Sequence, residues 1–203
     1  MDNNNIEKLR KQVKKALKKD KMRFRHTIGV ADTSACLAMR YGYDMEKAYI
    51  AGLLHDCAKC IPDEIKIQEC NDNNIEISDI EYNSPYLLHS KLGAFYAKTK
   101  YGITDDDICS AITYHTTGKP DMSLLDKIIF IADYIEPYRN KAGNLSEIRS
   151  LTFIDIDKAI KVVLHDTIEY LKESGKPIDQ TTVDTYNFYK DLYLYYLCKD
   201  IFE

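Results

Sequence analysis

Apolar residues recur every three or four positions through most of the chain, which is the spacing of an amphipathic helix. No segment shows a convincing strand alternation, and the chain contains neither an internal repeat nor a low-complexity segment. The fold class predicted from this pattern is all-α. The expected helices cover about residues 6–17, 22–41, 45–59, 87–100, 156–174 and 181 onward.

Helix stop and start signals divide the pattern further. Gly42 is a stop signal, and Asp44 is the expected N-cap of the helix that ends near Lys59, before a proline. Two pairs resemble capping boxes with Asp in place of the usual Glu, Thr104 with Asp107 and Ser123 with Asp126. The polar segment "NDNNIEISDIEYNSP" (71–85) is expected to be a loop, because it is rich in turn residues.

The chain has 203 residues, which is the size of one large domain. We expect a single domain over 1–203, with a core at about 20–140 and additional C-terminal helices over 146–200. The first expected helix is rich in lysine, and its basic residues are more typical of a solvated face than of a nucleic-acid site.

Charge and hydropathy restrict the function further. The net charge of −4 gives no indication of nucleic acid or an anionic membrane as the main partner. No apolar run approaches the roughly 20 residues that span a bilayer, and the N-terminus lacks the apolar stretch of a signal peptide. We therefore expect no membrane partner and a cytoplasmic location. The six cysteines are then expected to be reduced.

Cys57 and Cys60 form a C-x-x-C pair. A zinc ribbon needs a second such pair, and a thioredoxin-like motif needs a preceding strand in a βαβ unit. Neither is present in the sequence. Incidental thiols near a helix end are therefore the favoured interpretation.

Histidines and aspartates stand at unusual places in the helical pattern. The apolar run of "AGLLHDCAKC" leads directly into His55 and Asp56, and Asp133 lies inside the apolar run "LLDKIIFIADYI". Buried charges are costly unless they are paired or bound to a metal. The other histidines are His26, His89, His115 and His165.

Imidazole and carboxylate ligands together suit Fe, Mn or Zn better than Ca or Mg. No two of the histidines have the spacing of a local metal-binding motif, so tertiary packing of several helices would have to assemble such a site. One histidine alone is more often a satisfied core residue or an exposed one. The histidines and aspartates taken together, and not any one of them, indicate a metal centre.

The order "H…HD…H…H…D" resembles the signature of HD-domain metal-dependent phosphohydrolases. The segments "RFRHTIGV", "LLHDCAK", "LLHSKLGA", "YHTTGKPDMSLLDKIIFIADYIEPYR" and "DTYN" are similar to the bacterial YqeK family, the symmetrical diadenosine tetraphosphate hydrolases. This resemblance extends from about Arg23 to Asn187. It implies an enzyme that cleaves diadenosine tetraphosphate, a dinucleoside polyphosphate, at its centre to give two ADP.

The resemblance also implies roles for individual residues. The metal ligands would be His26, His55, Asp56 and Asp133. The expected cofactor is a divalent transition metal, iron by resemblance with Mn as an alternative, as one or two ions. With two ions Asp56 would bridge them. The residues that would act in catalysis are Asp56, His89 and His115, and His115 could donate a proton to the leaving phosphate.

The implied substrate contacts form a larger set. Arg23, Lys59 and Arg139 would neutralise phosphate charge, with Arg favoured for bidentate contacts. The remaining implied contacts are Asp56, His89, Tyr114, His115, Asp133 and the turn Gly175, Lys176 and Pro177. The sequence departs from the family pattern at Arg25 and Cys57, neither of which belongs to the expected metal set.

A second His-Asp pair and a tyrosine-rich segment are not expected to belong to the active site. His165 and Asp166 form a second His-Asp pair, but the apolar positions around them place both on the polar face of their helix. The tyrosine-rich segment from Thr181 could stack on adenine or join two copies in a homodimer. Packing in the core or at an interface is the favoured interpretation.

Two further classes of function stay open at this stage. The chain could be another HD enzyme, such as a nucleotidase or a cyclic-dinucleotide phosphodiesterase. It could also be a non-catalytic nucleotide-binding or ribosome-associated module that keeps the metal site as a scaffold. The long YqeK-like segment argues against the first alternative, and the complete ligand set argues against the second.

Overall fold

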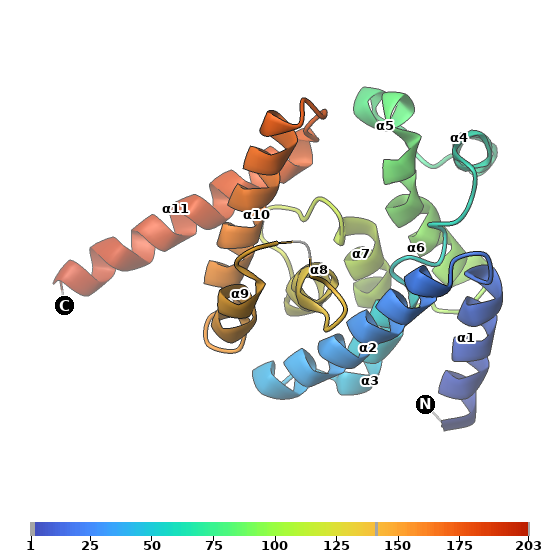
Figure 1. Cartoon of the computed structure of the whole chain (residues 1–203), viewed down its shortest axis with the longest axis horizontal. Helices are drawn as coiled ribbons and strands as arrows, with labels where there is room; N and C mark the ends of the chain where they lie inside the picture. The colour runs from blue at the N-terminus through green and yellow to red at the C-terminus, as the bar shows by residue number, and fades with distance from the viewer. Residues whose placement is uncertain (1–2, 141, 203) are drawn as a thin grey trace.

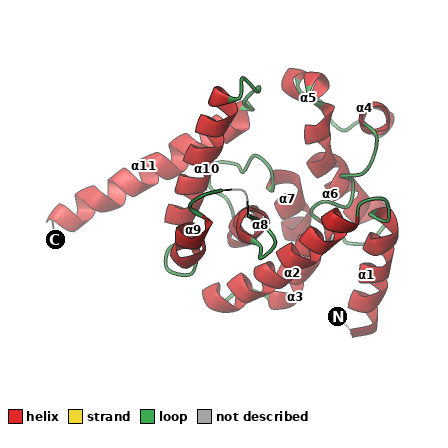
Figure 2. Ribbon diagram, viewed as in Figure 1, coloured by secondary structure: helices red, strands yellow, loops and turns green. Residues whose placement is uncertain are grey.

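The computed structural model describes residues 3–140 and 142–202, and the described part of the chain contains helices and no strands (Figure 2). The prediction of an all-α fold is confirmed. The helices are α1 Asn3–Ala16, α2 Lys21–Tyr41, α3 Met45–Leu54, α4 Asp63–Asp72, α5 Asp79–Asn83, the 3₁₀ helix η1 Pro85–Leu88, α6 His89–Thr99, α7 Asp106–Tyr114, α8 Leu124–Ile135, α9 Leu145–Thr152, α10 Ile156–Glu173 and α11 Gln180–Phe202.

The apolar core lies where α2, α3, α6, α7 and α8 pack together, with α1 against α3 (Figure 1). The helices α9, α10 and α11 form a second group that joins the core through the contacts of α8 with α9 and α10. Leu9, Val13 and Leu17 are buried as their spacing predicts. None of the described helices is long and apolar enough to cross a membrane.

Local signals set several helix ends where the sequence predicted them. The Asp20 side chain caps α2, which ends at Gly42 in the left-handed conformation, with φ of 71°. Asp44 caps α3 by accepting hydrogen bonds from two backbone amides. The capping box of Ser123 and Asp126 begins α8 as expected.

Three local predictions are wrong. The helix α3 ends at Leu54 instead of near Lys59, because residues 55–60 form turns with three-residue hydrogen bonds, such as that from the Lys59 amide to the Asp56 carbonyl. The expected loop 71–85 contains the short helix α5, which Ser78 and Glu81 begin with a capping box. Asp105, not Thr104, caps α7.

The C-terminal helix α11 extends well beyond the end of its partner α10 (Figure 1). Tyr189 is 1% exposed and packs in the core, which confirms core packing for this tyrosine. Tyr186 is half-buried and packs against the core. The side chains from residue 193 onward, which include the remaining tyrosines of the tail, lie outside the described residues.

Candidate active site

Three of the candidate histidines lie at helix ends that face one another. His55 follows the last residue of α3, His89 begins α6, and His115 follows the last residue of α7. The Nδ1 atom of each lies 2.6–2.7 Å from the carbonyl oxygen three residues earlier. Since a carbonyl only accepts, each imidazole in its neutral form carries the proton on Nδ1 and keeps the lone pair on Nε2. All three Nε2 lone pairs are thus available for a cation.

Asp56 is the centre of the cluster, and its two carboxylate oxygens contact different histidines. Oδ2 lies 3.4 Å from His55 Nε2 and 3.8 Å from His26 Nε2. Oδ1 lies 3.2 Å from His89 Nε2 and 3.7 Å from His115 Nε2. One carboxylate therefore faces two separate pairs of imidazoles.

Asp133 approaches the same cluster from α8. Its Oδ1 lies 2.9 Å from His26 Nε2 and 3.8 Å from His55 Nε2. The Nε2 atoms of His26 and His55 are nevertheless buried without a hydrogen bond. Buried polar atoms without partners are costly, and a bound cation between these nitrogens and the carboxylates would satisfy them.

The donor set fits a divalent transition metal. Among the described residues, three groups could hold an ion: His26 with His55 and Asp56, His55 with His115 and Asp133, and Asp56 with His89 and His115. Every member is an imidazole or a carboxylate, the ligands that suit Fe, Mn and Zn. The structure thus brings together all four predicted metal ligands and both additional histidines.

Electrostatics keep both aspartates ionised. Burial would raise the pKa of Asp56, but the neighbouring His55, His115 and His89 outweigh it and hold the pKa well below its ordinary value. Burial would likewise raise the pKa of Asp133, but the neighbouring His26 and His55 together with the Arg139 charge hold it well below its ordinary value. Both side chains are therefore carboxylates, as metal coordination requires.

Burial has the opposite consequence for the bases on one side of the cluster. Burial, reinforced by the Lys59 charge, lowers the pKa of His89 to about 4. Burial also lowers the pKa of Lys59, although Asp56 opposes this. Lys59 Nζ lies 3.0 Å from His89 Nε2. His89 is therefore a neutral imidazole at pH 7.

The three predicted phosphate-binding residues surround the carboxylates. Arg23 Nη1 donates to Asp56 Oδ2 at 2.8 Å, and Arg139 Nη2 donates to Asp133 Oδ1 at 2.8 Å. Lys59 Nζ lies 3.9 Å from Asp56 Oδ1. Each cation keeps further N–H groups for an anion.

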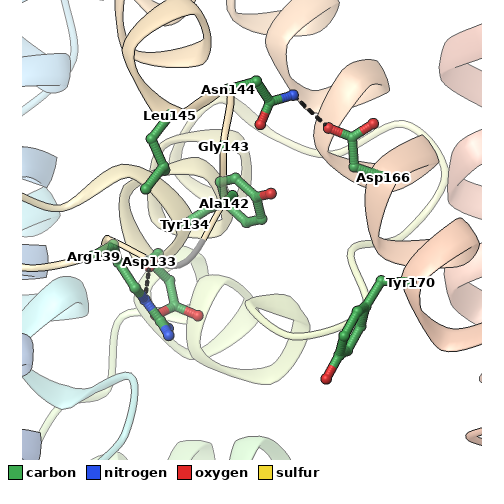
Figure 3. Close-up of a pocket in the computed structure, with 9 residues that line it drawn as sticks. All are labelled: Asp133, Tyr134, Arg139, Ala142, Gly143, Asn144, Leu145, Asp166 and Tyr170. Atoms are coloured by element: carbon green, nitrogen blue, oxygen red, sulfur yellow. Dashed lines mark hydrogen bonds and ion pairs between the residues drawn. The ribbon is translucent and has the colours of Figure 1, made fainter. Parts of the chain in front are cut away.

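A cavity of about 550 Å³ opens beside the cluster, and Asp133 and Arg139 form one of its walls (Figure 3). On the opposite side the α10 residues Asp166 and Tyr170 face it, and Asn144 Nδ2 donates to Asp166 Oδ2 at 2.8 Å. Sequence reasoning missed this use of Asp166. The cavity is lined by Asp133, Tyr134, Arg139, Ala142, Gly143, Asn144, Leu145, Asp166 and Tyr170.

Other sequence-predicted residues lie farther from the cluster. Lys176 Nζ lies 3.2 Å from the Tyr170 hydroxyl, so the turn Gly175–Pro177 borders the cavity through that contact without lining it. Tyr114 lines a different, smaller cavity, together with Thr116. His165 is exposed at the surface, as expected.

The helical fold and its cluster of histidines and aspartates define an HD-domain protein, and the family model described as HD domain matches residues 23–138. A solved HD superfamily hydrolase of Clostridium acetobutylicum, described as involved in NAD metabolism, is similar, with a TM-score of 0.87 and 40% identity over 92% of this chain and 97% of that chain.

Curated relatives narrow the class. The Halalkalibacterium halodurans protein named "Bis(5'-nucleosyl)-tetraphosphatase, symmetrical" is 42% identical over 81% of this chain and 87% of that protein. The Bacillus subtilis protein of the same name is 39% identical over 82% of this chain and 88% of its own length. The chain belongs to the family of symmetrical bis(5'-nucleosyl)-tetraphosphatases, and the predicted membership is confirmed.

Proposed function

We propose that this protein hydrolyses diadenosine tetraphosphate or a related dinucleoside tetraphosphate at its centre, giving two nucleoside diphosphates, ADP from the adenosine compound. The names of the relatives support the substrate class. The observation that carries the proposal is the carboxylate of Asp56, whose two oxygens face two pairs of histidines. This arrangement suits a bridging ligand between two ions.

We assign the metal ligands from the same geometry. His26, His55, Asp56 and Asp133 would hold a divalent transition metal, iron by family resemblance or Mn. Asp56, His89 and His115 would hold a second ion when one binds. A bound ion lowers the pKa of its water and withdraws charge from phosphate oxygens.

The residues around the carboxylates would bind the polyphosphate. Arg23, Lys59 and Arg139 present N–H groups beside the metal ligands, and charge-assisted hydrogen bonds to phosphate are the strong ones. When no second ion binds, His115 would instead carry a proton on Nε2 and give it to the departing diphosphate half.

The large cavity would take one nucleoside of the substrate. It begins at Asp133 and Arg139, so a phosphate held there directs the attached nucleoside toward Tyr134 and Tyr170. Both aromatic rings can pack on a base, and Asp166 can accept hydrogen bonds from a ribose or a base edge. The turn at Gly175, Lys176 and Pro177 borders this nucleoside through the contact of Lys176 with Tyr170.

The test is a chromatogram of products from diadenosine tetraphosphate in heavy-oxygen water. ADP as the sole product, with label on the terminal phosphate of half the molecules, is expected. Equal ATP and AMP would overturn central cleavage. Turnover of a nucleotide monophosphate or a cyclic dinucleotide with no tetraphosphate cleavage would favour another HD enzyme, and no turnover would favour a binding module.

Variants of the purified protein connect the activity to the cluster. Asp56→Ala is expected to lose bound metal and activity while circular dichroism still reports a helical protein. His165→Ala, which changes an exposed side chain, is the control and should keep both. Full metal content and normal turnover in Asp56→Ala would refute the assignment.

The proposal extends to the location of the protein and to its oligomeric state. We place the reaction in the cytoplasm, where its nucleotide substrates are found. We also propose that the tyrosine-rich α11 contributes to a homodimer, which sedimentation of the full chain against a chain ending at residue 192 would test.

A further inference from the structure

His26 differs from the other three clustered histidines in the group that holds its Nδ1 atom. His55, His89 and His115 each bond through Nδ1 to a backbone carbonyl three residues earlier. His26 Nδ1 instead lies 3.0 Å from the Oε1 atom of Glu136. A carboxylate forms a charge-assisted hydrogen bond, roughly twice as strong as a neutral one.

Glu136 is held in place from several directions. Its side chain follows the last turn of α8 and is 1% exposed. Oε2 accepts a hydrogen bond from the Tyr138 amide at 2.7 Å, and Arg149 donates to the Glu136 carbonyl at 2.8 Å. The carboxylate therefore has one fixed position, with one oxygen for Tyr138 and the other for His26.

The facing helix leaves room for this carboxylate only because Gly29 has no side chain. Gly29 lies one turn after His26 on α2, and a Cβ atom built there would lie 2.4 Å from Glu136 Oε2. An alanine at this position would force the carboxylate away from the imidazole. The glycine and the buried glutamate thus form a matched pair around one metal ligand.

We propose that Glu136 is a positioning residue for the metal centre, acting through His26. This inference rests on the metal site of the proposed function. The carboxylate holds the His26 proton on Nδ1, so Nε2 presents its lone pair toward Asp56 and Asp133. It also fixes the orientation of the ring, which aims Nε2 at a cation bound between those carboxylates.

The experiment titrates metal-free protein with Co²⁺, followed by visible absorption and by competition with a chelator. Glu136→Gln keeps the size of the side chain but removes its charge, and we expect Co²⁺ affinity to fall about 10- to 100-fold. The Co²⁺ absorption bands should also shift, which a general loss of stability would not cause. Unchanged affinity and bands would overturn the proposal.

Glu81→Gln is the matched control, because Glu81 is also a buried carboxylate, 5% exposed, but caps α5 and contacts no clustered histidine. Its Co²⁺ affinity should equal that of the wild-type protein. An equal loss in both variants would overturn the specific role of Glu136.

Gly29→Ala is the second variant, and it tests the role of Glu136 even if Glu136→Gln does not fold. It keeps the charge but displaces the carboxylate, so the Co²⁺ affinity should again fall, and a wild-type affinity would overturn the proposal. These outcomes are separate from the proposed reaction, because Co²⁺ binding is measured without substrate. Asymmetric cleavage by the wild-type protein would refute that reaction while leaving this result intact.

Discussion

Gly52→Ala tests how closely the metal centre depends on the packing of α2 against α3. A Cβ atom at Gly52 would lie 2.8 Å from Ala31 Cα and 2.9 Å from Ser34 Oγ, both on α2. Carbon atoms in favourable contact are about 3.5 Å apart or more, so the two helices would have to separate by roughly 0.7 Å. Since α2 carries His26 and α3 leads into His55, this shift moves two of the proposed metal ligands apart.

The clash is with backbone, so we place its cost near the upper end of overpacking, about 3 kcal/mol. Alanine regains about 1 kcal/mol through its helix propensity. The free energy of unfolding should therefore fall by about 2 kcal/mol, which for a protein of this size lowers the Tm by about 4–8 °C. Thermal unfolding of the metal-free protein by circular dichroism measures this change.

Metal binding should be more sensitive than stability to the same change. Metal–ligand distances tolerate only about 0.2 Å, so the Co²⁺ affinity of Gly52→Ala should fall about tenfold or more. Gly143→Ala is the control, because nothing lies within 4 Å of a Cβ atom there, and its stability should change by less than about 0.5 kcal/mol. A Gly52→Ala protein that melts at or above the wild-type temperature would refute the packing argument.

Two further predictions concern charge and thiol reactivity. Arg23→Ala, Lys59→Ala and Arg139→Ala should each keep bound metal and lose about ten- to hundred-fold in kcat/KM, from a charge-assisted hydrogen bond of about 1.5–3 kcal/mol. The control is Arg25→Ala, which also removes a positive charge, but the Arg25 guanidinium lies over the Tyr138 ring, so kcat/KM should stay near the wild-type value. Wild-type rates in all three test variants would place phosphate binding elsewhere. Burial raises the pKa of Cys57 to about 12, so iodoacetamide at pH 8 should modify exposed Cys36 in the folded protein and Cys57 only after unfolding. Equal rates, measured by peptide mass spectrometry, would contradict that burial.

The regular helices could be predicted because their apolar spacing and end signals agree. The limits of α2 follow from Gly42 and from the periodic apolar residues before it. The end of α3 could not be predicted in the same way, because "HDCAKC" has no residue that forbids a helix before Pro62. After Leu54 the chain forms turns, and the Asp56 carboxylate there contacts His89 and His115 from other parts of the fold, which is tertiary information.

The cluster itself was predicted from residue types and from family resemblance, since no local spacing unites residues that come from α2, α6, α8 and the turns after α3 and α7. Glu136 and Asp166 show what such reasoning omits. Asp166 belongs to a His-Asp pair whose helical phase indicates surface, yet its carboxylate borders the cavity because α10 packs beside α8. In "EPYR" the positive charge of Arg139 indicates phosphate binding, whereas residue type alone indicates no role for Glu136.

One residue of the sequence does indicate a role for Glu136, but it can be interpreted only when the fold is known. Gly29 follows His26 by one helical turn in "RFRHTIGV", inside a helix where glycine costs about 1 kcal/mol relative to alanine. A glycine at such a place indicates that something approaches the backbone closely, and that group is the Glu136 carboxylate. Gly52, three residues before His55, has the same relation to α2. In both cases a glycine lowers the intrinsic stability of a helix one turn from a proposed metal ligand, and it allows a group of another element to approach that helix closely.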